Sequence, residues 1–128
     1  LPNIAPALPL DVTQKGWSTE HGPFDLILLI NLLHLISTEA TQTLITEAAR
    51  ALAPGGTLIL YGPFKRGGAL TSPSDTRFDA ELRAADPEIG YKDDLDMARW
   101  LSDAALSPID RAEMPANNLA FIARKPQP

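Results

Sequence analysis

The feature that most constrains the fold is an aliphatic run at residues 24–30, Phe-Asp-Leu-Ile-Leu-Leu-Ile, followed by the polar residues Asn31 and His34. A transmembrane helix needs about 20 apolar residues, so this run is too short to cross a bilayer. A short, continuous apolar run is typical of a strand buried on both faces, as in a parallel sheet covered by helices. Ligands bind beyond the carboxyl ends of such strands. We therefore expect a functional site near Asn31 and His34.

The composition limits the partners that this chain of 128 residues could have. Its formal net charge is −5 and its eleven Lys and Arg residues are scattered, which argues against a nucleic-acid-binding surface. The chain has no cysteine, which excludes disulfides, thiol nucleophiles and cysteine metal sites. His21 and His34 have no matching ligands, so we expect no metal site.

The length fits one domain over residues 1–128. The Pro-rich start lacks the basic residues of a signal peptide, and no segment is long and apolar enough to span a membrane. We therefore expect a cytoplasmic protein. The first residue is Leu1 and the opening residues resemble the middle of a connection, so we expect a fragment of a longer protein.

The residues before the aliphatic run predict a strand and a loop. Residues 8–13 predict a short strand, which Pro9 restricts to a sheet edge or to a strand start. Residues 13–23 are polar and contain two glycines, and they predict a loop anchored by Trp17.

A βαβ unit is predicted around the aliphatic run. Ser37 or Thr38 can cap a helix that ends at residues 53–56, Ala-Pro-Gly-Gly, and a second buried strand follows at residues 57–61. The crossover between two such parallel strands is almost always right-handed. Residues at helical spacing give this helix an apolar face: Leu44, Ile45, Ala48 and Leu52.

The C-terminal half predicts a long loop, two helices and a hairpin. After a loop at residues 62–74, Ser72 and Pro73 start a helix that ends near Ala85 and packs through Phe78 and Leu82. A second helix starts at Asp93 or Asp94, and its predicted packing face is Met97, Trp100, Leu101 and Ala104. The short connection between the strands at residues 109–113 and 119–123 predicts an antiparallel pair at one edge of the sheet.

Several segments, taken in order, resemble one known fold. The segments are Leu-Asp-Val-Thr at residues 10–13, Ile-Asn-Leu-Leu-His-Leu-Ile-Ser at 30–37, Leu-Tyr-Gly-Pro-Phe at 60–64, Phe-Asp-Ala-Glu-Leu-Arg at 78–83, Asp-Pro at 86–87 and Glu-Met-Pro-Ala-Asn-Asn-Leu at 113–119. Together they resemble the C-terminal part of a class I S-adenosylmethionine-dependent methyltransferase. In detail the chain resembles the domain-of-unknown-function 938 (methyltransferase-like 26) family.

This resemblance implies an α/β fold with a Rossmann-like methyltransferase sheet that ends in an antiparallel hairpin. Of the seven strands of that sheet, the chain would hold strands three to seven and would lack the first two. The Gly-rich loop that normally holds the methionine part of the cofactor would be missing as well. The strand at residues 24–30 would then have an unpaired edge, which upstream chain or a second copy of the chain would cover. Self-association through this edge is therefore an expectation.

The resemblance also assigns roles to residues near the carboxyl ends of the strands. The Asp11 carboxylate would accept from the adenine amino group of S-adenosylmethionine, and Val12 would offer its backbone N–H. An Asp in such a place is also common in turns and helix caps. Asn31 is a candidate for cofactor contact because a polar side chain after five aliphatic residues needs partners; ordering the next turn is the alternative. His34 is a candidate general base, and a structural packing role is its alternative.

Tyr61, Phe64, Asn117 and Asn118 are candidates for substrate recognition, since the resemblance places them at the same end of the sheet. We thus expect a methyltransferase that uses S-adenosylmethionine on an unknown, small-molecule acceptor, with the chain alone inactive. A non-catalytic binding or interaction module that kept the sheet is the alternative. A third reading is half of an NAD-dependent dehydrogenase, and the terminal antiparallel hairpin argues against it.

Overall fold

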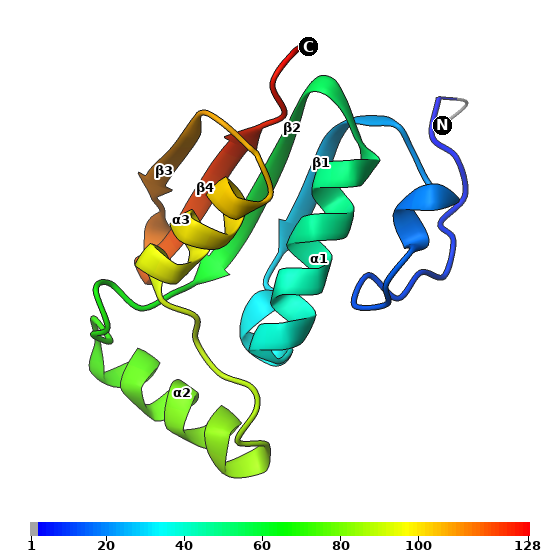
Figure 1. Cartoon of the computed structure of the whole chain (residues 1–128). Helices are drawn as coiled ribbons and strands as arrows, with labels where there is room; N and C mark the ends of the chain where they lie inside the picture. Colours follow the sequence, from blue (N-terminus) through cyan, green and yellow to red (C-terminus); the bar gives the residue numbers. More distant parts are fainter. Residues whose placement is uncertain (1–2) are drawn as a thin grey trace.

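A mixed β-sheet forms the centre of the computed structural model, which describes residues 3–128 (Figure 1). Within these residues the sheet has four strands in the order β1-β2-β4-β3. β1 is parallel to β2, whereas β4 is antiparallel to both β2 and β3. The strands are β1 Phe24–Ile30, β2 Leu52–Pro63, β3 Ile109–Glu113 and β4 Asn118–Arg124. The helices are α1 Thr38–Ala51, α2 Pro73–Ala85 and α3 Asp94–Asp103, with short 3-10 turns η1 Trp17–Thr19, η2 Leu33–Leu35 and η3 Pro115–Asn117.

Local capping explains where the helices begin. The Ser37 hydroxyl accepts from the N–H of Ala40 at 3.0 Å and caps α1, and the Ser72 hydroxyl does the same for α2. The predicted end of α1 was wrong. The helix ends at Ala51 and β2 begins at the next residue, so residues 53–56 belong to the strand. The backbone of Lys125 bonds to both Gly55 and Gly56, which extends the sheet across the expected turn.

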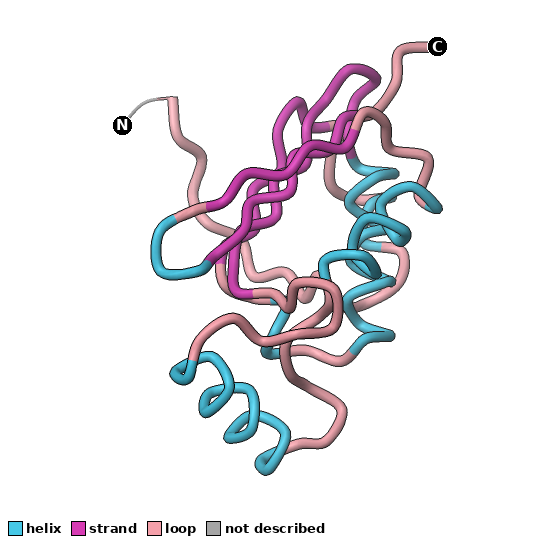
Figure 2. The backbone as a smooth tube through the Cα atoms, turned by 90° about the vertical axis from the view of Figure 1, so that its left-hand side faces the viewer, coloured by secondary structure: helices cyan, strands magenta, loops and turns pink. Residues whose placement is uncertain are grey.

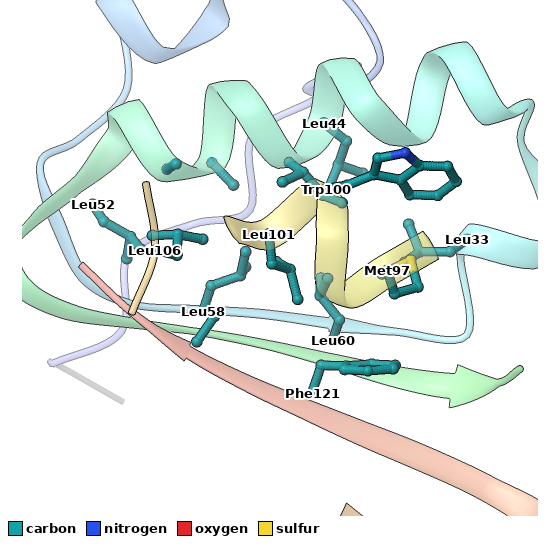
Figure 3. Packing of buried hydrophobic residues seen from close by; sticks show 14 of the residues in the cluster. Leu33, Leu44, Leu52, Leu58, Leu60, Met97, Trp100, Leu101, Leu106 and Phe121 are labelled. Carbon is teal, nitrogen blue, oxygen red and sulfur yellow. The ribbon is translucent and has the colours of Figure 1, made fainter. Parts of the chain in front are cut away.

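The core lies between one face of the sheet and the helices α1 and α3 (Figure 3). The predicted faces of these helices are buried, except that Ala104, which follows the end of α3, is partly buried. Trp17 is buried as an anchor of the N-terminal loop. Phe64 and Phe121 meet edge to face, with ring centroids 5.0 Å apart. The residues that form this core from helix and strand include Leu44, Ile45, Leu58, Leu60, Met97, Trp100, Leu101 and Phe121. We call this side the covered face.

The opposite side of the sheet, the bare face, has no helix packed against it. Both α1 and α3 lie on one side of the strands (Figure 2). Leu26, Leu28 and Ile30 of β1 are 52–56 % exposed. The prediction that this strand is buried on both faces was therefore wrong, because residues 3–128 supply one layer of helices, on one side of the sheet.

Two further predictions differ from the structure. Residues 8–13 form no strand, and Leu8 and Leu10 are exposed, because these residues have no strand beside them to complete a ladder. The second concerns the packing face of α2, which is only partly buried. Phe78 contacts the rings of His34 and Tyr91 but is 39 % exposed, and Asp79 is the one buried residue of the helix. The helix stands apart from the sheet at the lower edge of Figure 1. Within residues 3–128, no helix combines the length and apolarity needed to cross a membrane.

Candidate functional site at the carboxyl edge of the sheet

One edge of the sheet gathers four of the residues that the sequence singled out. The parallel strands β1 and β2 both end there, and the antiparallel strand β4 begins there, opposite Pro63. Asn31 follows β1, Tyr61 lies near the end of β2, and Asn117 and Asn118 lie at the start of β4. The topology therefore brings polar side chains from three chain segments to one edge, as expected for a site in this class of sheet.

Asn31 begins the β1–α1 loop, which we define as residues 31–37. Its φ of 56° is in the left-handed region, which Asn tolerates better than most residues. Its N–H donates to the Tyr61 carbonyl at 2.8 Å, which continues the β1–β2 ladder by one step. Gly62 lies directly beside it, because a Cβ on Gly62 would be 3.5 Å from Asn31 Oδ1. The Asn31 side chain is exposed and free to meet a ligand.

Tyr61 and Asn118 contact each other at this edge. The Asn118 amide donates to the Tyr61 hydroxyl at 3.3 Å and to the Pro115 carbonyl at 3.2 Å. Asn117 is exposed and adopts φ 62°, and its carbonyl accepts from Arg66. Tyr61, Asn117 and Asn118 can therefore offer polar groups to one bound molecule.

Phe64 is placed differently from its neighbours in this group. It is 3 % exposed and its ring packs on Phe121, so its side chain belongs to the core rather than to an open surface. Arg66, which the sequence did not single out, links this region. Its guanidinium donates to the carbonyls of Phe64 and Asn117 and to the Glu113 carboxylate. The Arg66 guanidinium holds the pKa of Glu113 below its usual range.

Asp11 and Val12 lie in the N-terminal segment that runs past the start of α1. The Asp11 carboxylate accepts from the N–H and hydroxyl of Thr13, and the hydroxyl bond is the main reason for its lowered pKa. The Val12 carbonyl accepts from the Trp17 indole at 2.9 Å. Residues 13–15 and the first turn of α1 line a shared hollow of about 370 Å³, so this turn lies close to the end of the β1–α1 loop.

His34 is buried beneath α2. It is 7 % exposed, and its ring lies edge-on to Phe78 and Tyr91 with centroids 5.7 and 6.1 Å away. Burial lowers its pKa, and the positive charge of Lys92 adds to this effect. Both effects favour the neutral form of the imidazole, which is the form that acts as a general base.

Two buried charged residues hold loops in place, Glu47 the N-terminal segment and Lys92 the loops at this edge, and the sequence interpretation missed both. Glu47 accepts from Gly16 N–H, Ser18 N–H and the Ser18 hydroxyl at 2.9–3.1 Å. Burial raises its pKa, but these donors outweigh burial and leave the pKa below its usual value. Lys92 donates to three carbonyls, from Leu33, Ile36 and Gly90. Burial, followed by repulsion from Arg83 and partly offset by Asp79, lowers the pKa of Lys92 to about 8.

Tyr61 and Lys65 have the spacing of the Tyr-x-x-x-Lys pair that many dehydrogenases carry. Residues four apart face each other on a helix. Here Tyr61 lies in β2 and Lys65 lies in the loop after it, so the pair has no helix to bring it together. The spacing therefore gives no support to the dehydrogenase reading.

The chain has the fold of one section of Rossmann-like class I methyltransferases. It resembles an O-methyltransferase family protein from Burkholderia thailandensis (TM-score 0.80, 17 % identity, 94 % of this chain and 35 % of that one). It also resembles human N-acetylserotonin methyltransferase in complex with SAM (TM-score 0.76, 16 % identity, 94 % and 33 %). A third similar structure is an O-methyltransferase family 2 protein from Planctomyces limnophilus in complex with apigenin (TM-score 0.71, 22 % identity, 80 % and 32 %). The chain thus spans about a third of these proteins.

The chain belongs to the DUF938 family, described as proteins of unknown function, whose model matches residues 1–125. The resemblance to this family noted from the sequence is therefore confirmed.

The residues present fit S-adenosylmethionine in part. The exposed Asp11 carboxylate and Asn31 amide could bind the polar groups of its adenosine. The methionine part needs free backbone donors, usually from a Gly-rich turn between strand and helix. Between strand and helix, the described residues hold one glycine pair, Gly67 and Gly68. These two N–H groups already donate to the carboxylates of Asp94 and Asp93.

Proposed function

We propose that this chain is part of an S-adenosylmethionine-dependent methyltransferase that acts on a small molecule in the cytoplasm. The observation that carries the proposal is the strand arrangement. The antiparallel strand β4 lies between β2 and β3, beside a parallel β1–β2 pair, as in the methyltransferase sheet. An all-parallel dinucleotide-binding sheet has no such strand.

In this proposal the carboxyl edge holds both ligands. Asp11, Val12 and Asn31 bind the adenosine side of the donor, while Tyr61, Asn117 and Asn118 contact the acceptor. The sulfonium of S-adenosylmethionine is already an activated methyl donor, so the protein mainly has to align the two molecules and exclude water. His34 is the candidate base if the acceptor needs to lose a proton. Phe64 supports the edge from the core.

A non-catalytic module is the second candidate function, and the engaged glycine pair favours it. With Gly67 and Gly68 bonded to Asp94 and Asp93, the described residues offer no ready cradle for the methionine carboxylate. The methyltransferase proposal therefore holds that this chain alone does not transfer methyl groups and that the reaction requires protein segments beyond these 128 residues.

Calorimetric titration with S-adenosylmethionine tests the proposal. The ligand is titrated into the 128-residue chain and into the full product of its coding sequence. We expect D11N and N31A to weaken binding by about tenfold each, or about 1.4 kcal/mol. The control D110N removes an exposed carboxylate from β3, away from the carboxyl edge, and should leave binding unchanged. The absence of binding at millimolar ligand to the full product rejects the methyltransferase and favours the non-catalytic module.

A further inference from the structure

Lys92 is buried in an unusual way for a lysine. Its side chain is part of a residue that is only 6 % exposed, and lysines are almost never fully buried unless they are paired. No salt bridge to it occurs in the described residues, where its partners are backbone carbonyls. An ammonium group has three donors, and all three are used. The group thus acts as a tether rather than as half of an ion pair.

This tether joins segments that are distant in sequence. Two of the carbonyls, those of Leu33 and Ile36, belong to the β1–α1 loop that begins at Asn31. The third, that of Gly90, belongs to the segment leading into α3, and the Gly90 N–H donates to the His34 carbonyl at 3.1 Å. The segment at residues 90–92 therefore donates three hydrogen bonds to carbonyls of the β1–α1 loop, two from the Lys92 ammonium and one from the Gly90 N–H.

The backbone of Lys92 joins a third segment. Its carbonyl accepts from the Lys65 N–H at 2.9 Å, and the Lys65 carbonyl accepts from the Asp94 N–H at 3.0 Å. Lys65 lies two residues after the end of β2. Residue 92 therefore connects the loops that follow both β1 and β2, which are the two loops at the candidate site.

We propose that Lys92 is a positioning residue, whose ammonium holds the β1–α1 loop, and with it Asn31, in place at the carboxyl edge. The part of this proposal that concerns ligand binding rests on the proposed function. Without the ammonium, the buried carbonyls of Leu33 and Ile36 lose their donor, and an unsatisfied buried acceptor favours opening of the loop. The ionisable groups around Lys92 are Arg83 and Asp79 from α2 and His34 from the loop itself.

The test compares K92M, which keeps most of the length of the side chain but removes its donors, with K92R and K125M. Lys125 is a matched control, because its ammonium donates to the Leu52 carbonyl at 2.8 Å, at the opposite end of the sheet. Hydrogen exchange is measured by NMR on the full 128-residue chain without ligand. The reporters are the amides of Asn31, Leu35 and Gly90, each of which donates to a backbone carbonyl near the edge.

We expect K92M to accelerate exchange at the reporter amides by roughly tenfold or more, while amides in the middle of α1 and β2 keep their wild-type rates. K92R should restore part of the protection, because it keeps the charge but its planar guanidinium cannot aim three donors at one point. K125M should leave the three reporters unchanged. Unchanged reporters in K92M, or equal acceleration throughout the chain, would overturn the proposal.

A spectroscopic measurement on the wild-type chain covers the case in which K92M does not fold. A buried ammonium that donates three hydrogen bonds exchanges its protons slowly and gives an observable ¹⁵Nζ signal at neutral pH, whereas exposed lysines do not. One such signal is expected in the wild-type chain and in K125M, and its absence from the wild-type chain overturns the proposal.

Titration of S-adenosylmethionine into the full coding-sequence product and into its K92M variant separates the positioning role of Lys92 from the proposed methyltransferase function. If K92M opens the loop but the wild type does not bind S-adenosylmethionine, the tether is retained and the proposed function is rejected. If the wild type and K92M bind S-adenosylmethionine equally well, the positioning role is rejected.

Discussion

The two faces of the sheet are built from similar aliphatic side chains and have opposite environments. On the covered face, Leu58 and Leu60 are fully buried beneath α1 and α3. On the bare face, Leu26 and Leu28 of the adjacent strand are more than half exposed. Hydrophobicity alone therefore predicts that a strand needs two covering layers, but it does not say where these layers come from. In this chain one layer is present and the bare face is open.

The largest expected effect comes from truncating a side chain on the covered face. Leu60→Ala removes a fully buried side chain from the cluster in Figure 3 and should lower the free energy of unfolding by about 3 kcal/mol. Ile59→Ala, one residue away on the bare face, should cost about 1 kcal/mol, because its side chain is only partly buried. Urea unfolding followed by circular dichroism measures both. Equal losses would contradict the difference between the faces.

A smaller effect is expected where the N-terminal segment is fastened to the covered side. Glu47→Ala leaves three donors of Gly16 and Ser18 without their acceptor, which should cost about 2 kcal/mol. Detachment of this segment should also speed trypsin cleavage after Lys15. Gln42→Ala, on the exposed side of the same helix, is the control and should stay within about 0.5 kcal/mol of the wild type. Unchanged cleavage in Glu47→Ala would show that other contacts hold the segment.

Features that depend on neighbouring residues in the sequence are predicted more easily than features that depend on distant ones. β1 and β3 have the predicted bounds because their signals are local: a continuous apolar run in one case, and flanking turn residues in the other. The starts of α1, α2 and α3 follow from capping residues three or fewer positions away. The polar edge with Asn31, Tyr61 and Asn118 follows from the rule that parallel strands end together.

What the sequence does not reveal depends on distant partners. Glu47 meets Ser18 across 29 positions, and Lys92 meets Leu33 across 59, so neither has a local signature. The interpretation of residues 8–13 as a strand failed for the same reason, since a strand exists only when another strand lies beside it. His34 and Phe64 have the right residue types for a site, but the packing of Phe78, Tyr91 and Phe121 buries them.

The pH dependence of the unfolding free energy tests the burial of His34. Burial lowers the pKa of His34 from its ordinary value near 6.5, so the unfolded chain binds this proton more readily than the folded chain. Stability from this group is present above pH 6.5 and is lost as the pH falls below it. His34→Gln should therefore flatten the dependence of the unfolding free energy on pH below 6.5, as measured by urea unfolding at a series of pH values. An unchanged slope in His34→Gln would contradict the assignment.

The smallest effect on stability, and the clearest effect on assembly, is expected on the bare face. β1 is one of the two edge strands of the described sheet, and an edge strand with exposed aliphatic side chains can pair with another chain. We therefore expect the isolated chain to self-associate through β1 as its concentration rises. Leu28→Lys should change the unfolding free energy by less than about 0.5 kcal/mol, since the side chain is half exposed.

The same substitution should shift the chain toward monomer in sedimentation velocity, because a charge on the bare face opposes its burial. Leu95→Lys is a matched control, because Leu95 is also an exposed leucine but lies on α3 rather than on the sheet. Association that persists in Leu28→Lys and is lost in Leu95→Lys would place the contact on the helical layer instead. The bare face would then make no contact between chains, and the two faces would differ only in their exposure to solvent.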